Sequence, residues 1–214
     1  MWQRVGAHHL AALAILALLA ALGIASHSLA QLANDAAHQT EARLGLLSRV
    51  QGLSLERADR DAAFHRVANR LLLTNSRVDT GAAREIVDGA RALERKNQAM
   101  GTYLAEVSPI LPEEERNSFA GAFQLVAQAV SEVVVRAEAL AEEPGDSARL
   151  ESVGTSTRAL DEVLLHAQSR VEGALSRGRN RAETIVERTR IWTGSLGAAA
   201  LVLVAFAARK RALS

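Results

Sequence analysis

The sequence predicts an all-α protein, namely an up-down-up-down four-helix bundle carried on two membrane-spanning helices that are continuous with its first and fourth helices. Three observations lead to this prediction. Helix-forming residues dominate the 214-residue chain, whereas only 3% of residues are aromatic and three are proline, a composition that favours helix over sheet. Two long stretches carry no charge. Between them, apolar residues recur at alternating spacings of four and three.

The two uncharged stretches cover residues 5–34 and 191–208. A helix needs about 20 mainly apolar residues to cross roughly 30 Å of hydrocarbon, so both stretches qualify, the second at the short end. Arg4 precedes the first stretch and the basic cluster 209–211 follows the second. Because basic residues mark the cytoplasmic side of membrane helices, both termini are predicted to be cytoplasmic. Residues 31–190 are then predicted to lie outside the cytoplasm.

The chain is therefore expected to divide into four regions. They are a cytoplasmic N-terminus with the first transmembrane helix (1–30), an external domain (31–190), a second transmembrane helix (191–208) and a short basic cytoplasmic tail (209–214). A cleavable signal peptide is the alternative for the first region. A basic residue, an apolar core and the sequence SLA before Gln31 have that form. Either interpretation exports the middle region.

Four amphipathic helices are predicted in the middle region. Their seams run over residues 46–78, 86–107, 119–140 and 150–171, with seam residues alternately four and three apart. This spacing keeps one apolar stripe facing a partner helix, as in a left-handed bundle. The seam of the third helix consists of Phe119, Phe123, Val126, Val130, Val133, Ala137 and Leu140.

Turn and capping residues separate these helices. Asp79 or Thr80 can cap the second helix, Pro112 and three acids can begin the third, and Asp146 or Ser147 can cap the fourth. Short turns make consecutive helices antiparallel neighbours. The turns are predicted at 76–81, 108–112 and 142–146.

Polar residues interrupt the apolar seams at one level of the predicted bundle. Arg57 and Arg60 fall on the first seam, Asn97 falls on the second, and Asp161 and Glu162 lie at the same level of the fourth helix. Buried arginine is rare unless it is paired. The level is therefore either a salt-bridged layer that fixes the register or a site where guanidinium groups bind an anionic ligand. The ligand-binding candidates are Arg57, Arg60, Asn97 and Asp161.

The sequence contains no pattern typical of an enzyme. It has no cysteine, which excludes disulfides, thiolate catalysis and cysteine-ligated metals. It also lacks a phosphate-binding glycine loop, a nucleophile elbow and zinc-ligand spacing. We therefore predict no catalytic activity, no cofactor and no metal site. The arginine-rich segment 176–190 is predicted to lie outside the membrane, where contact with lipid headgroups fits better than nucleic acid.

Two spans that bracket an external four-helix bundle resemble the sensing half of bacterial methyl-accepting chemotaxis receptors. The stretch ANRLLLTNSRVDTGAAREIVDGARALERKNQAMGTYLAEVSPILPEEE (68–115) is similar to that family around its first distal turn, where a basic residue and a leucine run close one helix and an alanine-rich helix follows. The CHASE3-type sensory bundle of sensor kinases has a comparable layout. The resemblance implies a protein of the bacterial inner membrane in which residues 31–190 form a periplasmic four-helix-bundle sensory domain. It also implies signalling through small shifts of the first helix against the fourth. Those receptors continue into a HAMP linker and a signalling coiled coil, whereas this sequence stops at Ser214, so we expect a separate membrane protein to receive the shift.

The expected partners are the membrane, a second copy of the chain and that membrane signalling partner. The outer helices exceed the inner ones in length by about 25 Å outside the membrane, and a lone helix pair buries little apolar surface. Two chains are therefore predicted to pair as a homodimer through their first and fourth helices, with Gln39 and Arg43 on the contact face. The alternative function is a structural or adaptor protein whose bundle holds a partner without any ligand.

Overall fold

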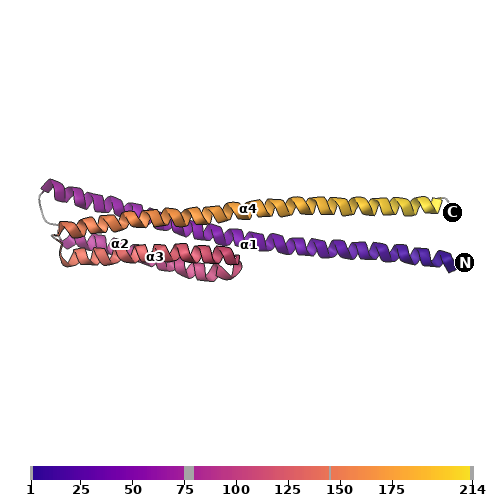
Figure 1. Cartoon of the computed structure of the whole chain (residues 1–214), viewed down its shortest axis with the longest axis horizontal. Helices are drawn as coiled ribbons and strands as arrows, with labels where there is room; N and C mark the ends of the chain where they lie inside the picture. Colours follow the sequence, from indigo (N-terminus) through magenta and orange to yellow (C-terminus); the bar gives the residue numbers. More distant parts are fainter. Residues whose placement is uncertain (1, 75–79, 145, 213–214) are drawn as a thin grey trace. The chain divides into compact units, whose positions relative to one another are not determined.

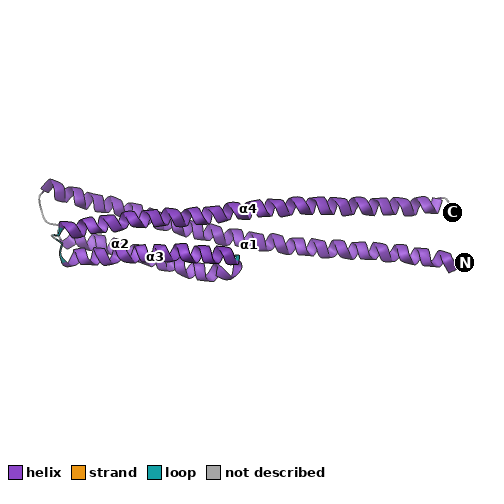
Figure 2. Cartoon of the chain, viewed as in Figure 1, coloured by secondary structure: helices purple, strands orange, loops and turns teal. Residues whose placement is uncertain are grey.

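The computed structural model describes residues 2–74, 80–144 and 146–212, and it describes side chains for 16–65 and 80–202, except 18, 63 and 145, and for 205. This part of the chain is helical, with no strand (Figure 2), and the predicted all-α class is confirmed. The elements are α1 (Trp2–Thr74), α2 (Thr80–Val107), the 3-10 turn η1 (Ser108–Ile110), α3 (Glu113–Glu142) and α4 (Ser147–Ala212).

The chain forms two compact units, and both long helices contribute to each of them. The first unit is a helical bundle made of Gln39–Ser176, and the second consists of residues 1–38 and 177–214. Within the bundle, α2 and α3 are joined through η1 and lie side by side, antiparallel to each other (Figure 1). The packed bundle is thus shorter at both ends than the region 31–190 that the sequence predicts to be external.

The predicted seams form the core of the bundle. All seven seam residues of α3 are buried, and each fully buried large apolar side chain stabilises the fold by roughly 1.5–3 kcal/mol. The first seam is confirmed from Leu46 to Leu53, while its positions 67, 71, 74 and 78 lie outside the described side chains. The seam of α4 is buried at Val153, Thr157, Leu160, Leu164, Ala167 and Val171.

Two of the predicted helix starts are visible in the structure. Pro112 is extended (φ −56°, ψ 147°) and α3 begins immediately after it, with three glutamates in its first turn, where they interact favourably with the helix dipole. Asp146 caps α4, because its Oδ1 accepts a hydrogen bond from the Ala148 N–H at 2.9 Å. The second helix begins at Thr80, and Asp79 lies outside the described residues.

In the described part of the chain, α3 is the one helix that is long and apolar enough to cross a membrane. Its apolar face, from Phe119 to Leu140, is packed into the bundle core, so the length and composition of α3 suit a core helix. The two spans predicted from the sequence lie within 1–30 and 191–208. Part of each span falls on residues whose side chains are not described, namely 1–15, 203, 204 and 206–208.

Candidate functional site

The predicted polar level is present in part, as an ion pair between the two long helices. Arg57 on α1 reaches Asp161 on α4, with Nη2 2.5 Å from Oδ2, and its Nη1 lies 3.9 Å from the Asp61 carboxylate. The Arg57 side chain is 15% exposed and that of Asp161 is 35% exposed. Among the described residues, the buried Nε of Arg57 has no hydrogen-bond partner. The guanidinium is therefore charge-compensated but incompletely hydrogen-bonded.

Arg60 belongs to a different cluster, on the side of α1 that faces α2. Its Nε and Nη2 lie 3.1 and 3.0 Å from Oε1 of Glu56, and the other oxygen of Glu56 lies 2.7 Å from Lys96 Nζ on α2. The hydrogen bond from Lys96 lowers the pKa of Glu56 below its ordinary value, and Arg60 lowers it further, against the opposing effect of burial. Glu56 thus neutralises one cation from each of two helices.

The four predicted site residues therefore do not form one constellation. Arg57 and Asp161 are joined, whereas Arg60 is bound to Glu56. Asn97 is half-buried, and no hydrogen bond connects it to either arginine among the described side chains. Glu162 is exposed on α4. At Arg57 the salt-bridged interpretation describes the geometry, while Arg60 lies beside an opening that the sequence could not reveal.

That opening is a small pocket between all four helices of the bundle. Its interior volume is about 30 Å³, which is room for one or two water molecules. Two glycines keep nearby space free, because a Cβ at Gly89 would lie 2.8 Å from Arg60 Cδ and a Cβ at Gly154 would lie 3.2 Å from Phe64 Cζ. The apolar lining consists of Phe64, Ile86, Gly89, Ala90, Leu93, Val133 and Val153, and the polar lining consists of Arg60, Asp61, Glu85 and Thr157.

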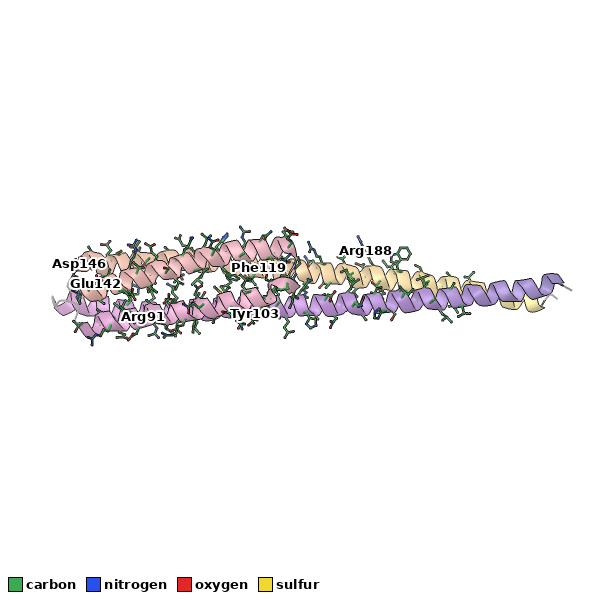
Figure 3. The ribbon with its side chains drawn as sticks, turned by 90° about the horizontal axis from the view of Figure 1, so that it is seen from below. Arg91, Tyr103, Phe119, Glu142, Asp146 and Arg188 are labelled. Atoms are coloured by element: carbon green, nitrogen blue, oxygen red, sulfur yellow. The ribbon has the colours of Figure 1, made fainter. Side chains whose placement is uncertain are left out.

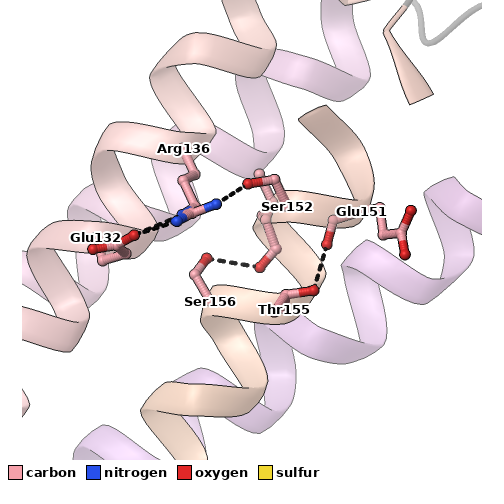
Figure 4. Close-up of polar contacts among 7 residues, drawn as sticks. Glu132, Arg136, Glu151, Ser152, Thr155 and Ser156 are labelled. Atoms are coloured by element: carbon pink, nitrogen blue, oxygen red, sulfur yellow. Dashed lines mark hydrogen bonds and ion pairs between the residues drawn. The ribbon is translucent and has the colours of Figure 1, made fainter. Parts of the chain in front are cut away.

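A second arginine cluster connects α3 to the start of α4 (Figure 4). Arg136 donates from Nε to Glu132 at 2.8 Å and also hydrogen-bonds the Ser152 hydroxyl. The hydroxyls of Thr155 and Ser156 donate to backbone carbonyls of their own helix. Arg136 and the hydroxyls of Ser152, Thr155 and Ser156 are thus all bonded within the protein, which indicates a structural clamp.

Sequence reasoning missed the most buried ion pair in the described bundle, Arg43–Glu115. Arg43 Nε lies 2.9 Å from Oε2 and Nη2 lies 3.1 Å from Oε1, a two-pronged contact between α1 and the first turn of α3, with side chains only 3% and 6% exposed. Gln39 accepts a further bond from Arg43 at 3.4 Å. The prediction that Arg43 faces a second chain is therefore wrong. The seam spacing, continued three residues before Leu46 and four residues before Phe119, leads to Arg43 and Glu115. The sequence therefore contained the information needed to predict this pair.

An aromatic contact between α1 and α2 lies close to Arg43 along α1. Tyr103 of α2 occupies the space above Gly45 of α1, where a Cβ would stand 2.6 Å from the ring carbon Cζ. The Arg49 guanidinium stacks over the ring at 3.5 Å from its centroid, a favourable cation–π geometry. Tyr103 and Phe119 mark this end of the bundle in Figure 3, and Glu142 and Asp146 mark the other.

None of the known protein families, curated proteins or solved structures with which the chain was compared matches it. Its function is therefore argued from its own residues.

Proposed function

We propose that this protein is a membrane-bound sensory module, chemoreceptor-like in layout, whose bundle senses a ligand or stress in the bacterial periplasm and passes it on through shifts of α1 against α4. The observation that carries the proposal is the continuity of these helices. Each is one uninterrupted helix that contributes a packed face to the bundle and also contains one of the two uncharged apolar stretches of the sequence.

The apolar stretches support a membrane location because their described side chains are exposed. Leu19 is 60% exposed and Ile24 is 69% exposed on α1, while Leu201 is 73% exposed on α4. A contiguous apolar surface of this kind is unfavourable in water and marks a membrane or protein contact. Because residues 5–34 and 191–208 carry no charge on any face, hydrocarbon suits them better than a protein groove that covers one face.

The proposed orientation rests on the basic residues beyond the outer ends of the two apolar stretches. With Arg4 and the cluster 209–211 in the cytoplasm, the bundle lies in the periplasm, and spans within 1–30 and 191–208 cross the inner membrane. Alkaline phosphatase fused after residue 110 should then be active, and the same enzyme fused after Ser214 should be inactive. The reverse pattern would contradict the proposal. Loss of about 3 kDa from the N-terminus would instead show cleavage after Ala30.

The sensing step is proposed to act at the pocket beside Arg60. A ligand that fills a space lined by four helices binds best in one helix arrangement and so shifts the population toward it. The pair Arg57–Asp161 connects α1 directly to α4 at this level, so a displacement of α1 is transmitted to α4. Small helix shifts of this type are a known means of switching. The receiving partner contacts the apolar segments of the two helices.

One observation favours the alternative, a structural or adaptor protein. Arg57 is already neutralised by Asp161 and the pocket is small, so the bundle needs no ligand to balance this charge or to fill its interior. Arg57→Leu separates a structural ion pair from an anion site at this arginine. A scaffold loses about 1 kcal/mol of stability, because Asp161 is left unpaired but partly hydrated. A site that holds excess positive charge for an anion becomes more stable when the arginine is removed. Thermal melting of the ligand-free protein gives the sign.

A homodimer also belongs to the proposal, and the structure supplies a face for it. Within the part of α1 that belongs to the bundle, six uncharged residues recur at alternating spacings of four and three. All six side chains are exposed. This heptad pattern is a second seam that no described residue of the chain covers. We name it the outer stripe, and it consists of Leu44, Ser48, Gln51, Leu55, Ala58 and Ala62.

A further inference from the structure

The last turns of α4 before its apolar stretch carry five arginines and two glutamates, which the helix separates by face. At about 100° per residue, Arg177, Arg181 and Arg188 fall on one side of α4, within an arc of about 60° that also contains Trp192. No acidic residue lies in this arc. We name this set the basic face; its arginines are exposed and Trp192 is 70% exposed.

The other side of the same turns has mixed charge and little net electrostatic character. Arg179 pairs with Glu183 at 3.1 Å, and Glu187 and Arg190 complete two positive and two negative charges there. By contrast, no carboxylate among the described side chains lies within ion-pair distance of the three arginines of the basic face. Figure 3 shows Arg188 projecting outward from α4. Exposed arginines on one face, kept apart from the acids of the same segment, constitute an anion-binding surface.

We propose that the basic face binds the headgroups of anionic phospholipids and thereby sets the depth of α4 in the bilayer. This inference rests on the proposed membrane location. Arg188 lies three residues, or about 4.5 Å, before Ile191, which places it within a headgroup layer about 5–7 Å thick. Trp192 follows one turn later on the same face, at the boundary with hydrocarbon, where tryptophan is enriched in membrane proteins.

The geometry predicts a graded contribution along the basic face. Arg181 is about 15 Å from the start of the apolar stretch, roughly one Debye length of about 8 Å beyond the headgroups at physiological salt. Arg177 is about 21 Å away, where screening removes most of its attraction. Arg188 therefore dominates, Arg181 contributes weakly and Arg177 hardly at all.

The experiment uses the full chain with Trp2→Phe, so that Trp192 is the remaining tryptophan. The protein is placed in phosphatidylcholine vesicles that contain a trace of dansyl-labelled phosphatidylglycerol or of dansyl-labelled phosphatidylcholine. Energy transfer from Trp192 reports how strongly each lipid is enriched around the helix. We expect phosphatidylglycerol to be favoured about three- to fivefold at low salt, with the preference disappearing at 1 M salt, where the Debye length is about 3 Å.

Two variants with the same loss of charge test the face. Arg188→Gln should remove most of the preference, whereas Arg177→Gln, on the same face but about 21 Å from the apolar stretch, should leave it nearly unchanged. Equal transfer to both lipids in the unaltered protein, or an equal effect of the two variants, overturns the inference. If transfer to the two lipids is equal, the basic face would instead be expected to bind an acidic protein surface.

A second fluorescence measurement distinguishes loss of the headgroup site from an error in the proposed membrane location. Lipids brominated near the top of their acyl chains should quench Trp192 if α4 enters the bilayer. Quenching without any preference for phosphatidylglycerol overturns the headgroup site alone. Absence of quenching overturns the membrane location and the headgroup site together.

Discussion

At the scale of single residues, the most informative comparison is between two arginines of α1 that both interrupt an apolar seam. Arg43 and its partner Glu115 are almost fully buried, whereas Arg57 and Asp161 keep 15% and 35% exposure. Removing one partner of a dry pair leaves a charge that water cannot reach. The same change in a wet pair leaves a charge that is partly hydrated. The two pairs should therefore respond very differently to truncation.

Arg43→Leu is expected to destabilise the protein by about 3–5 kcal/mol, several times the loss for Arg57→Leu, because Glu115 is then stranded in the core. The double variant Arg43→Leu with Glu115→Leu should recover most of the loss, since leucine fills the space without a desolvation penalty. Denaturant unfolding in detergent, followed by far-UV circular dichroism, measures these differences. A loss no larger than that of Arg57→Leu would show that water enters this end of the bundle.

The Glu56 cluster predicts a dependence of stability on pH. Its carboxylate has a lowered pKa because Lys96 and Arg60 hydrogen-bond it. The resulting stabilisation is present above the ordinary value of 4.5 and is lost as the pH falls through the lower folded pKa. Glu56→Gln should cost about 1 kcal/mol or less at pH 7, since Lys96 is 48% exposed. This difference from the unaltered protein should shrink as the pH falls below 4.5 and disappear once the pH is below the lowered folded pKa. A difference that grows at low pH would contradict the assignment.

At the scale of secondary-structure elements, the packing of α1 against α2 depends on Gly45 beneath Tyr103. Alanine in a helix is normally favoured over glycine by about 1 kcal/mol. At Gly45 the added methyl group would overlap the Tyr103 ring and displace it from Arg49, which costs about 1–3 kcal/mol. Gly45→Ala should therefore destabilise the protein, yet stabilise it in a Tyr103→Ala background. Thermal melting of this double-mutant cycle tests the reversal.

A matched control for this cycle is Gly101→Ala on α2. A Cβ at Gly101 meets no atom within 4 Å, so the substitution should stabilise the helix by about 0.5–1 kcal/mol in either background. If Gly45→Ala behaves like Gly101→Ala in the protein with Tyr103 present, then the ring is free to move and the contact with Gly45 contributes little to helix packing.

The elements also show which parts of the structure a sequence can predict. The seam of α3 was predicted at every position because a spacing of four and three has one solution, a stripe that faces a partner. The ion-pair partner of Arg60 was not predictable from the sequence. Glu56 lies one turn earlier on the same helix and Asp161 lies on another helix, and only the structure shows which of them is nearer. The level at which Tyr103 meets Gly45 depends on the relative shift of two helices, and local spacing does not determine that shift. Arg43–Glu115 was predictable in principle, because both charges continue an apolar seam.

At the scale of the whole molecule, the bundle buries most described positions of its predicted seams yet leaves the outer stripe of α1 exposed. Leu44 is 53% exposed and Leu55 is 66% exposed, three helical turns apart on one face. In a single membrane, two copies have the same orientation, so identical positions of their outer stripes meet at the same height. A parallel pairing then places Leu44 beside Leu44 and Leu55 beside Leu55. The absence of charge in the outer stripe avoids the repulsion that identical charges would produce there.

Single cysteines in membranes test this pairing, and the chain has no cysteine of its own to interfere. Leu44→Cys and Leu55→Cys should each form a disulfide between chains, because helices packed through small residues bring facing Cα atoms within the roughly 7 Å that a disulfide requires. Val135→Cys, on α3 and 61% exposed, is the control for random collision and should remain monomeric. Arg43→Cys should also fail, since that position is enclosed within one bundle. Cross-linking at Val135 as efficient as at Leu55 would contradict a dimer through the outer stripe.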